Sequence, residues 1–206
     1  MKRSSAGSIA ALILLFPVAC TADDEPLHGA AALKSACSGV FDAGSIKEAK
    51  KSTKIDQVRA DRQEDYPAAA RALVDEKRMV KVCSIPFEGD PADGSSAFRI
   101  QFHVGDEPLF PRNEKRSTSG YRAYGLKSGL QATSESGSSD VFFPCTPKGS
   151  ISSVDVTASL YNDLDLVEQT RFRILFRSTE KMIAALKCKN EVTLPRPESM
   201  RPFPVG

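Results

Sequence analysis

Two parts of the chain repeat apolar residues at helical spacing, three or four positions apart. The first follows Asp65, which can cap a helix, and has Pro67 in its first turn, where a missing N–H costs nothing. Its buried face comprises Tyr66, Ala69, Ala70, Leu73 and Val74. The second begins at the capping-box pair Asp165 and Glu168. Its core face comprises Phe172, Leu175, Phe176, Thr179, Met182, Ile183 and Leu186.

Four segments have strand patterns. Residues 79–85 are rich in Val, and residues 141–145 are an apolar run in which Pro144 predicts the end of pairing. In the other two segments apolar and polar residues alternate, which is typical of a strand covered on one face. Their apolar positions are Phe98, Ile100, Phe102 and Val104, followed by Val154, Val156, Ala158 and Leu160. Polar residues Arg99, Gln101 and His103 share the opposite face of the first of them.

The order of these elements predicts an α+β fold, in which helices pack on one face of a single antiparallel sheet. A strand, a turn and an alternating strand occur twice, at 79–104 and 141–161, with helices before the first unit and after the second. A further short helix, Ile46 to about Lys51, is predicted from the capping-box spacing of Ser45 and Glu48.

The segments between and beyond these elements are predicted to be connections. Residues 105–139 are rich in Gly and Ser and predict a loop, with one short strand around Tyr121, Tyr124 and Leu126. We therefore expect a flexible tether over 20–36, one domain over 37–195, and an extended Pro-rich tail over 196–206.

The first twenty residues have the parts of a secretory signal, so residues 1–19 are predicted to be removed. A basic start is followed by an apolar run over 9–16 and then by Val18-Ala19-Cys20, which looks like the end of a bacterial lipoprotein signal. Cys20 would then carry lipid and become the mature N-terminus. Pro17 departs from the aliphatic residue usual at that position. One alternative is cleavage after Ala22, which leaves a soluble secreted protein; an uncleaved anchor is disfavoured because the run is shorter than ~20 residues.

The net charge argues against some classes of partner. Removal of the signal takes Lys2 and Arg3 away, so 28 basic residues become 26, equal to the 26 acidic ones. This balance counts against a nucleic-acid-binding protein of the usual basic kind and against a polybasic membrane patch. Five residues of the 105–139 loop make it mildly basic and can contact an anionic polymer, although a solvated loop is the simpler interpretation: Arg112, Lys115, Arg116, Arg122 and Lys127.

The four cysteines after Cys20 predict two disulfides, because an exported chain with an even number of dispersed cysteines usually pairs them. Zinc ligands and redox pairs come closer together in sequence. A strand of about 10 residues spans ~33 Å after Cys145, and a helix of about 23 steps returns ~35 Å, so Cys188 should reach Cys145. Cys37 and Cys83 then pair by exclusion.

Catalytic motifs are weak. Ser178 and Lys181 match S-x-x-K, and residues 127–129 match K-[ST]-G, but their order is reversed relative to β-lactamases and penicillin-binding proteins. Thr179 belongs to the apolar face of its helix, so Ser178 and Lys181 are interpreted as solvated residues flanking that face. His28 falls in the tether and His103 on a polar strand face, without the turn of a serine hydrolase. Asp163 with Asp165 can be cast as a carboxylate pair, but Asp165 is better explained as a helix cap.

The cysteine-bearing segments resemble those of small exported lipoproteins of actinobacteria whose function is uncharacterised. The resemblance covers 37–195 and rests on Cys37-Ser-Gly-Val-Phe, Cys83 in a strand, Phe143-Pro144-Cys145, and Leu186-Lys187-Cys188 before Leu194-Pro195. It implies export, a lipid anchor and paired cysteines, and it implies no activity.

The sequence thus favours a non-enzymatic binding or accessory protein, held by lipid on the extracytoplasmic face of a bacterial membrane. No cofactor or metal is expected, and the expected partners are the membrane, through the lipid, and an unidentified protein or envelope component. The alternative is a cell-envelope hydrolase. A pocket in which His103 meets a serine or a carboxylate favours the hydrolase, and a shallow polar surface favours the binding protein.

Overall fold

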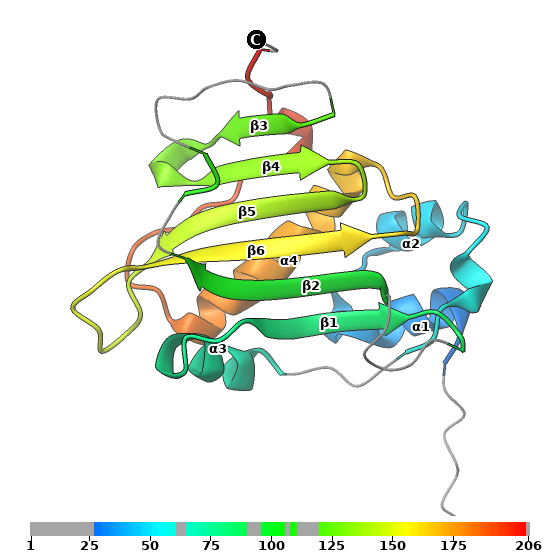
Figure 1. Cartoon of the computed structure of the whole chain (residues 1–206), viewed down its shortest axis with the longest axis horizontal. Coiled ribbons are helices and arrows are strands. Elements are labelled where there is room, and N and C mark those ends of the chain that lie inside the picture. Colours follow the sequence, from blue (N-terminus) through cyan, green and yellow to red (C-terminus); the bar gives the residue numbers. More distant parts are fainter. Residues whose placement is uncertain (1–26, 61–64, 90–95, 106–107, 111–119, 205–206) are drawn as a thin grey trace, which may run out of the picture.

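The computed structural model describes residues 27–60, 65–89, 96–105, 108–110 and 120–204. Within them lies one antiparallel six-stranded sheet with the order β1-β2-β6-β5-β4-β3 (Figure 1). The strands are β1 (Val80–Pro86), β2 (Ser96–Gly105), β3 (Arg122–Gly125), β4 (Gln131–Glu135), β5 (Ser138–Cys145) and β6 (Val154–Asn162). The predicted α+β class is confirmed, and the long strands β2 and β6, which carry the alternating patterns, pair at the centre.

The helices lie on one face of this sheet, as predicted (Figure 1). They are α1 (Gly29–Ser35), α2 (Ala43–Ala49), α3 (Tyr66–Asp75) and α4 (Glu168–Leu186), with short 3-10 turns between some of them. The long helix α4 runs obliquely behind the middle of the sheet, and α3 packs beside it near the β1 edge. Asp65 caps α3 by accepting a 2.6 Å hydrogen bond from the N–H of Ala68, as the sequence predicts.

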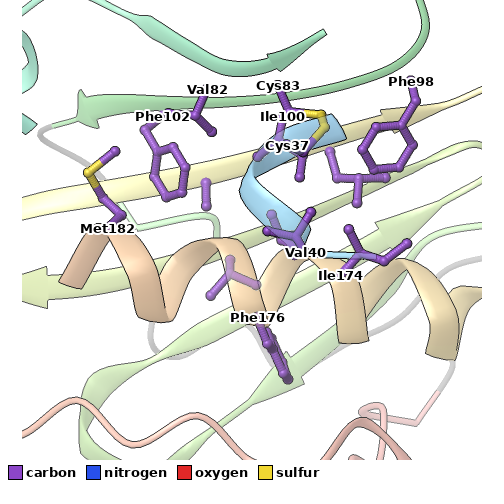
Figure 2. Close-up of a cluster of buried hydrophobic side chains, with 14 of the residues drawn as sticks. Cys37, Val40, Val82, Cys83, Phe98, Ile100, Phe102, Ile174, Phe176 and Met182 are labelled. Atoms are coloured by element: carbon purple, nitrogen blue, oxygen red, sulfur yellow. A yellow bond between two sulfur atoms is a disulfide. The ribbon is translucent and has the colours of Figure 1, made fainter. Parts of the chain in front are cut away.

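The core lies between the sheet and these helices. Figure 2 shows Phe98, Ile100 and Phe102 of β2 facing the side of α4 that carries Ile174 and Met182. All five side chains are buried. Complete burial of each large apolar side chain contributes on the order of 1.5–3 kcal/mol, so this layer holds α4 on the sheet.

Both predicted disulfides are present. Cys145 at the end of β5 pairs with Cys188 just after α4, with 5.2 Å between their Cα atoms. Closing this loop of 43 residues contributes ~4 kcal/mol in the chain-entropy description. Cys37 pairs with Cys83 of β1, with 4.9 Å between the Cα atoms, and its sulfur lies within the core (Figure 2). The first bond fastens the helix layer to one end of the sheet, and the second fastens the N-terminal segment to the edge strand.

The ends of the domain differ from the prediction. Helix α1 lies inside the segment 20–36 predicted as a flexible tether, and its Ala32 and Leu33 are fully buried, so that prediction is wrong from residue 28 onward. The segment 196–206 was predicted to lie outside the domain. Its described part packs on the sheet instead, because Met200 is buried and the N–H of Phe203 donates a 2.8 Å hydrogen bond to the carbonyl of Ala123 in β3.

The segment 105–139 contains more strand than predicted. Strand β3 lies within the short strand expected around Tyr124, but β4 and the start of β5 lie where a loop was predicted. Strand β4 has the sequence Gln-Ala-Thr-Ser-Glu, whose only apolar residue is Ala132. Pairing on both sides, with β3 and β5, holds it in the sheet without a bulky apolar face. The turn predicted between the two strands of the 79–104 unit lies mostly outside the described residues.

The sequence prediction names the wrong N-cap residue for two helices, α2 and α4. The N-cap of α2 is Asp42, which accepts a 2.7 Å hydrogen bond from the N–H of Ser45, so Ser45 is the donor and not the cap. Asp165 lies three residues before α4 with a φ of 52° and does not cap it. Glu48 of α2 caps α4 instead, because it accepts hydrogen bonds from the N–H of Val167, at 2.6 Å, and from the hydroxyl of Thr170.

Pro144 ends pairing on one side of β5 only. The register with β4 stops at Phe142, whereas the register with β6 continues through Pro144 opposite Asp155 to Cys145 opposite Val154. The carbonyl of Pro144 is free of the β4 ladder and accepts a 2.8 Å hydrogen bond from the side-chain amide of Asn190. The predicted break in pairing is therefore right for β4 and wrong for β6.

Candidate functional site

The predicted lipidation residue, Cys20, lies outside the described residues. The four other cysteines are consumed by the two disulfides, so they offer no thiolate as a metal ligand or a nucleophile. No group of three His, Cys, Asp or Glu side chains in the described ranges is placed to hold a metal ion. Over those same ranges, no helix combines the length and the apolar character that a membrane span requires.

Ser178 is buried, and its predicted solvation is wrong. Its Oγ lies 2.8 Å from the hydroxyl of Tyr66 in a hydrogen bond that joins α3 to α4. Burial raises the pKa of Tyr66 to about 12, so the phenol is neutral at ordinary pH. Lys181 is exposed, as predicted. Ser178 therefore has a structural role, and Lys127–Gly129 follow β3 at the edge of the sheet opposite the β1 edge on which α3 packs.

His103 is half-buried on the face of the sheet that bears no helix, and it lies near Asp140 of β5. Asp140 accepts hydrogen bonds from Thr133, at 3.3 Å, and from Ser159, its cross-strand partner. Burial raises the pKa of Asp140, and its hydrogen bonds and the nearby His103 act against this. In a catalytic triad the histidine lies between the serine and the carboxylate, whereas here the serine bonds the carboxylate directly, so this arrangement does not activate Ser159.

Asp163 and Asp165 line a polar cavity of about 420 Å³ beside the turn between β4 and β5. Arg171 of α4 reaches this cavity and is only 8% exposed. Its guanidinium donates to four neutral acceptors: Ser134 Oγ, Ser139 Oγ and the carbonyls of Glu135 and Leu166. These bonds use Arg171 to clamp the β4–β5 turn onto α4. Sequence reasoning missed this residue, because nothing around it marks a buried cation.

A second and larger cavity is a groove of about 540 Å³ between α3, the end of α4 and the turn after β5, hereafter the α3–α4 groove. Helix α3 and the last turns of α4 lie side by side near that turn (Figure 1). Most of its lining is aliphatic and has no polar side-chain atom: Pro67, Ala70, Val74, Pro147, Ala184, Ala185 and Leu186. Small side chains on both helices leave this space open.

Charged residues stand at the rim of the α3–α4 groove. Arg71, Lys148 and Lys187 are exposed cations that line it, and Asp75 is the one acid beside them, so the formal balance of the lining is +3 − 1 = +2. None of the three cations forms an ion pair within 4.0 Å to another described residue. The lining of the groove thus has a local excess of positive charge.

The Cys145–Cys188 disulfide holds the rim of the groove in place. Beside this bond, the N–H of Lys189 donates a 2.8 Å hydrogen bond to the carbonyl of Thr146. Asn190 accepts from the N–H of Thr146, at 2.7 Å, and donates to the carbonyl of Pro144. These contacts fix the β5–β6 turn, with Pro147 and Lys148, relative to the end of α4.

The mildly basic segment predicted to contact an anionic polymer is described only in part. Arg112, Lys115 and Arg116 lie outside the described residues. Arg122 forms a 3.2 Å ion pair with Glu168 at the start of α4, and Glu168 also accepts a 2.6 Å hydrogen bond from Tyr124. Arg122 and Tyr124 therefore fasten β3 to α4, whereas Lys127, the other described cation of the five, is exposed.

Comparison with known proteins found no protein-family model, no curated protein and no solved structure that matches this chain.

Proposed function

We propose that this chain is a non-enzymatic binding protein of the bacterial cell envelope, held by lipid at Cys20 on the extracytoplasmic face of the membrane. Its two disulfides indicate an oxidising, extracytoplasmic environment, and this agrees with the signal-like N-terminal sequence. The lipid joins the domain to the membrane, and the domain itself binds an envelope component.

The observation that carries the binding role is the α3–α4 groove. It combines a concave aliphatic lining with charged groups at its edge, which is the usual construction of a ligand site. The rim is held by a disulfide and by hydrogen bonds, so binding requires little ordering of the protein.

The rival hydrolase has its best support in the neighbourhood of His103 and Asp140. Neither residue lines the polar cavity beside Asp163 or the α3–α4 groove. The hydroxyl of Ser159 is hydrogen-bonded to Asp140, whereas a serine nucleophile is hydrogen-bonded to the base that activates it, usually a histidine. Binding at the groove is therefore the better supported function.

A groove-filling variant tests this function. Ala185→Phe places a ring in the groove, and Ala43→Phe makes the same change on the exposed start of α2. Envelope components retained by the wild type and by Ala43→Phe should be lost from Ala185→Phe, as measured by mass spectrometry of the purified proteins. Equal retention by all three proteins contradicts a binding role for the groove, and ester hydrolysis that disappears in His103→Ala supports the hydrolase.

A further inference from the structure

We infer that the α3–α4 groove binds a fatty-acid-like amphiphile: an aliphatic chain along the groove and a carboxylate at its cationic rim. This inference rests on the binding function proposed above and names its ligand class. The membrane to which the domain would be anchored contains acyl chains, so the ligand would come from lipid.

The lining of the groove favours an aliphatic chain over a peptide. A peptide brings backbone N–H and C=O groups, and each of these loses free energy when it is buried without a hydrogen-bonding partner. The aliphatic side chains of Ala70, Val74 and Ala185 offer no hydrogen-bonding partner to such groups. An alkyl chain has no such groups, and each CH₂ that it buries contributes ~0.8 kcal/mol.

The charges at the rim favour an anionic headgroup. Lys187 alone is accounted for by the negative end of the α4 dipole, because it follows the last helical residue. Arg71 comes from α3 and Lys148 from the β5–β6 turn, so neither serves that helix end. Three elements thus converge to give a positive rim, which is offset only by Asp75. A carboxylate placed there gains from these cations, and a cationic headgroup is repelled.

Two probes with chains of the same length and opposite charge test this inference: decanoate and decyltrimethylammonium, each below its micelle concentration. Isothermal titration calorimetry on the full-length protein should detect decanoate binding at least tenfold tighter than binding of the ammonium probe. The heat-capacity change should be negative, which is the mark of apolar burial.

Two variants, each with a matched control, test whether the probe binds in the groove. Ala185→Phe should weaken decanoate binding at least tenfold, whereas Ala43→Phe leaves it unchanged. Lys148→Glu should weaken decanoate binding several-fold and strengthen binding of the ammonium probe. Lys50→Glu makes the same charge change on the exposed end of α2 and should alter neither. Circular dichroism melts confirm that each variant is folded before it is titrated.

Each result supports or overturns the inference. Equal affinity for both probes, lost in Ala185→Phe, overturns the anionic ligand but leaves a binding groove and hence the proposed function. Decanoate binding that survives Ala185→Phe overturns the site. No binding of either probe overturns the lipid-like ligand. If an acidic amphipathic peptide then binds and is lost in Ala185→Phe, the occupant is a protein and the proposed function stands.

Discussion

The hydroxyl of Tyr66 lies 2.8 Å from the Oγ of Ser178, and both groups are buried between α3 and α4. This polar contact crosses the interface between the two helices and joins residues 112 positions apart. It also lies between the same two helices that form the α3–α4 groove, so the packing that it fixes sets the width of that groove.

Ser178→Ala should lower the free energy of unfolding by about 1–3 kcal/mol, because the buried hydroxyl of Tyr66 loses its partner. Lys181→Ala, on the exposed side of the same helix, should change it by less than about 0.5 kcal/mol. Urea unfolding monitored by circular dichroism measures both. Equal stabilities of the two variants would contradict the structural role of Ser178.

Glu48→Ala should destabilise the domain by about 1–2 kcal/mol, because α4 loses the carboxylate that satisfies the N–H of Val167. Asp165→Asn is the matched change at the residue that sequence analysis assigned to this cap. Asn tolerates the positive φ of Asp165, so its effect should stay within about 0.5 kcal/mol. A larger loss for Asp165→Asn than for Glu48→Ala in thermal unfolding would reverse the assignment.

Asp140 should make stability depend on pH. Burial raises the pKa of its carboxyl above the usual 3.8 in the folded protein, so folding favours the protonated form. Its contribution to stability is complete below the unfolded pKa and is lost as the pH rises through the folded pKa. Asp140→Asn cannot ionise, so its stability relative to wild type should improve as the pH rises from below 3.8 through the raised pKa of the folded protein. A relative stability that stays constant or falls with pH sinks this prediction.

Gly125→Ala should release the C-terminal segment from β3. A Cβ at Gly125 would lie 2.5 Å from the Cζ of Phe203, so the ring must move. The variant should lose about 1 kcal/mol or more and show faster hydrogen exchange at the N–H of Phe203. Gly44→Ala, where the new Cβ would lie 3.4 Å from its nearest neighbour, is the control and should be neutral or slightly stabilising. Unchanged exchange at Phe203 would show that the tail does not depend on this contact.

The sequence predicts the fold where side-chain periodicity and burial agree. Strand β2 alternates apolar and polar residues over its length, and α3 has its cap and its buried face in the expected places. The matching lengths of β6 and α4 made the Cys145–Cys188 bond predictable, because both elements run the length of the sheet. Strand β4 was missed because Ala132 gives too little apolar signal, although pairing on both sides holds it in the sheet.

The misassigned residues depend on neighbours that are distant in sequence. Glu48 caps a helix that starts 120 residues later, since α4 begins at Glu168, and local spacing around Asp165 cannot reveal this. Ser178 is buried, and its hydroxyl bonds that of Tyr66, which lies 112 residues earlier in the chain. The α3–α4 groove arises from small residues such as Ala70 and Ala185, each of which looks ordinary on its own helix. Only their juxtaposition makes a cavity.

The proposed lipid anchoring at a membrane is tested most directly by the intact mass and detergent partition of the mature chain, compared with Cys20→Ser. Wild type should begin at Cys20, carry acyl chains and enter the detergent phase, whereas Cys20→Ser should lack acyl mass and stay in the aqueous phase. If both proteins are free of lipid and wild type begins at Asp23, the chain is a soluble secreted protein and the lipid-anchored function is contradicted.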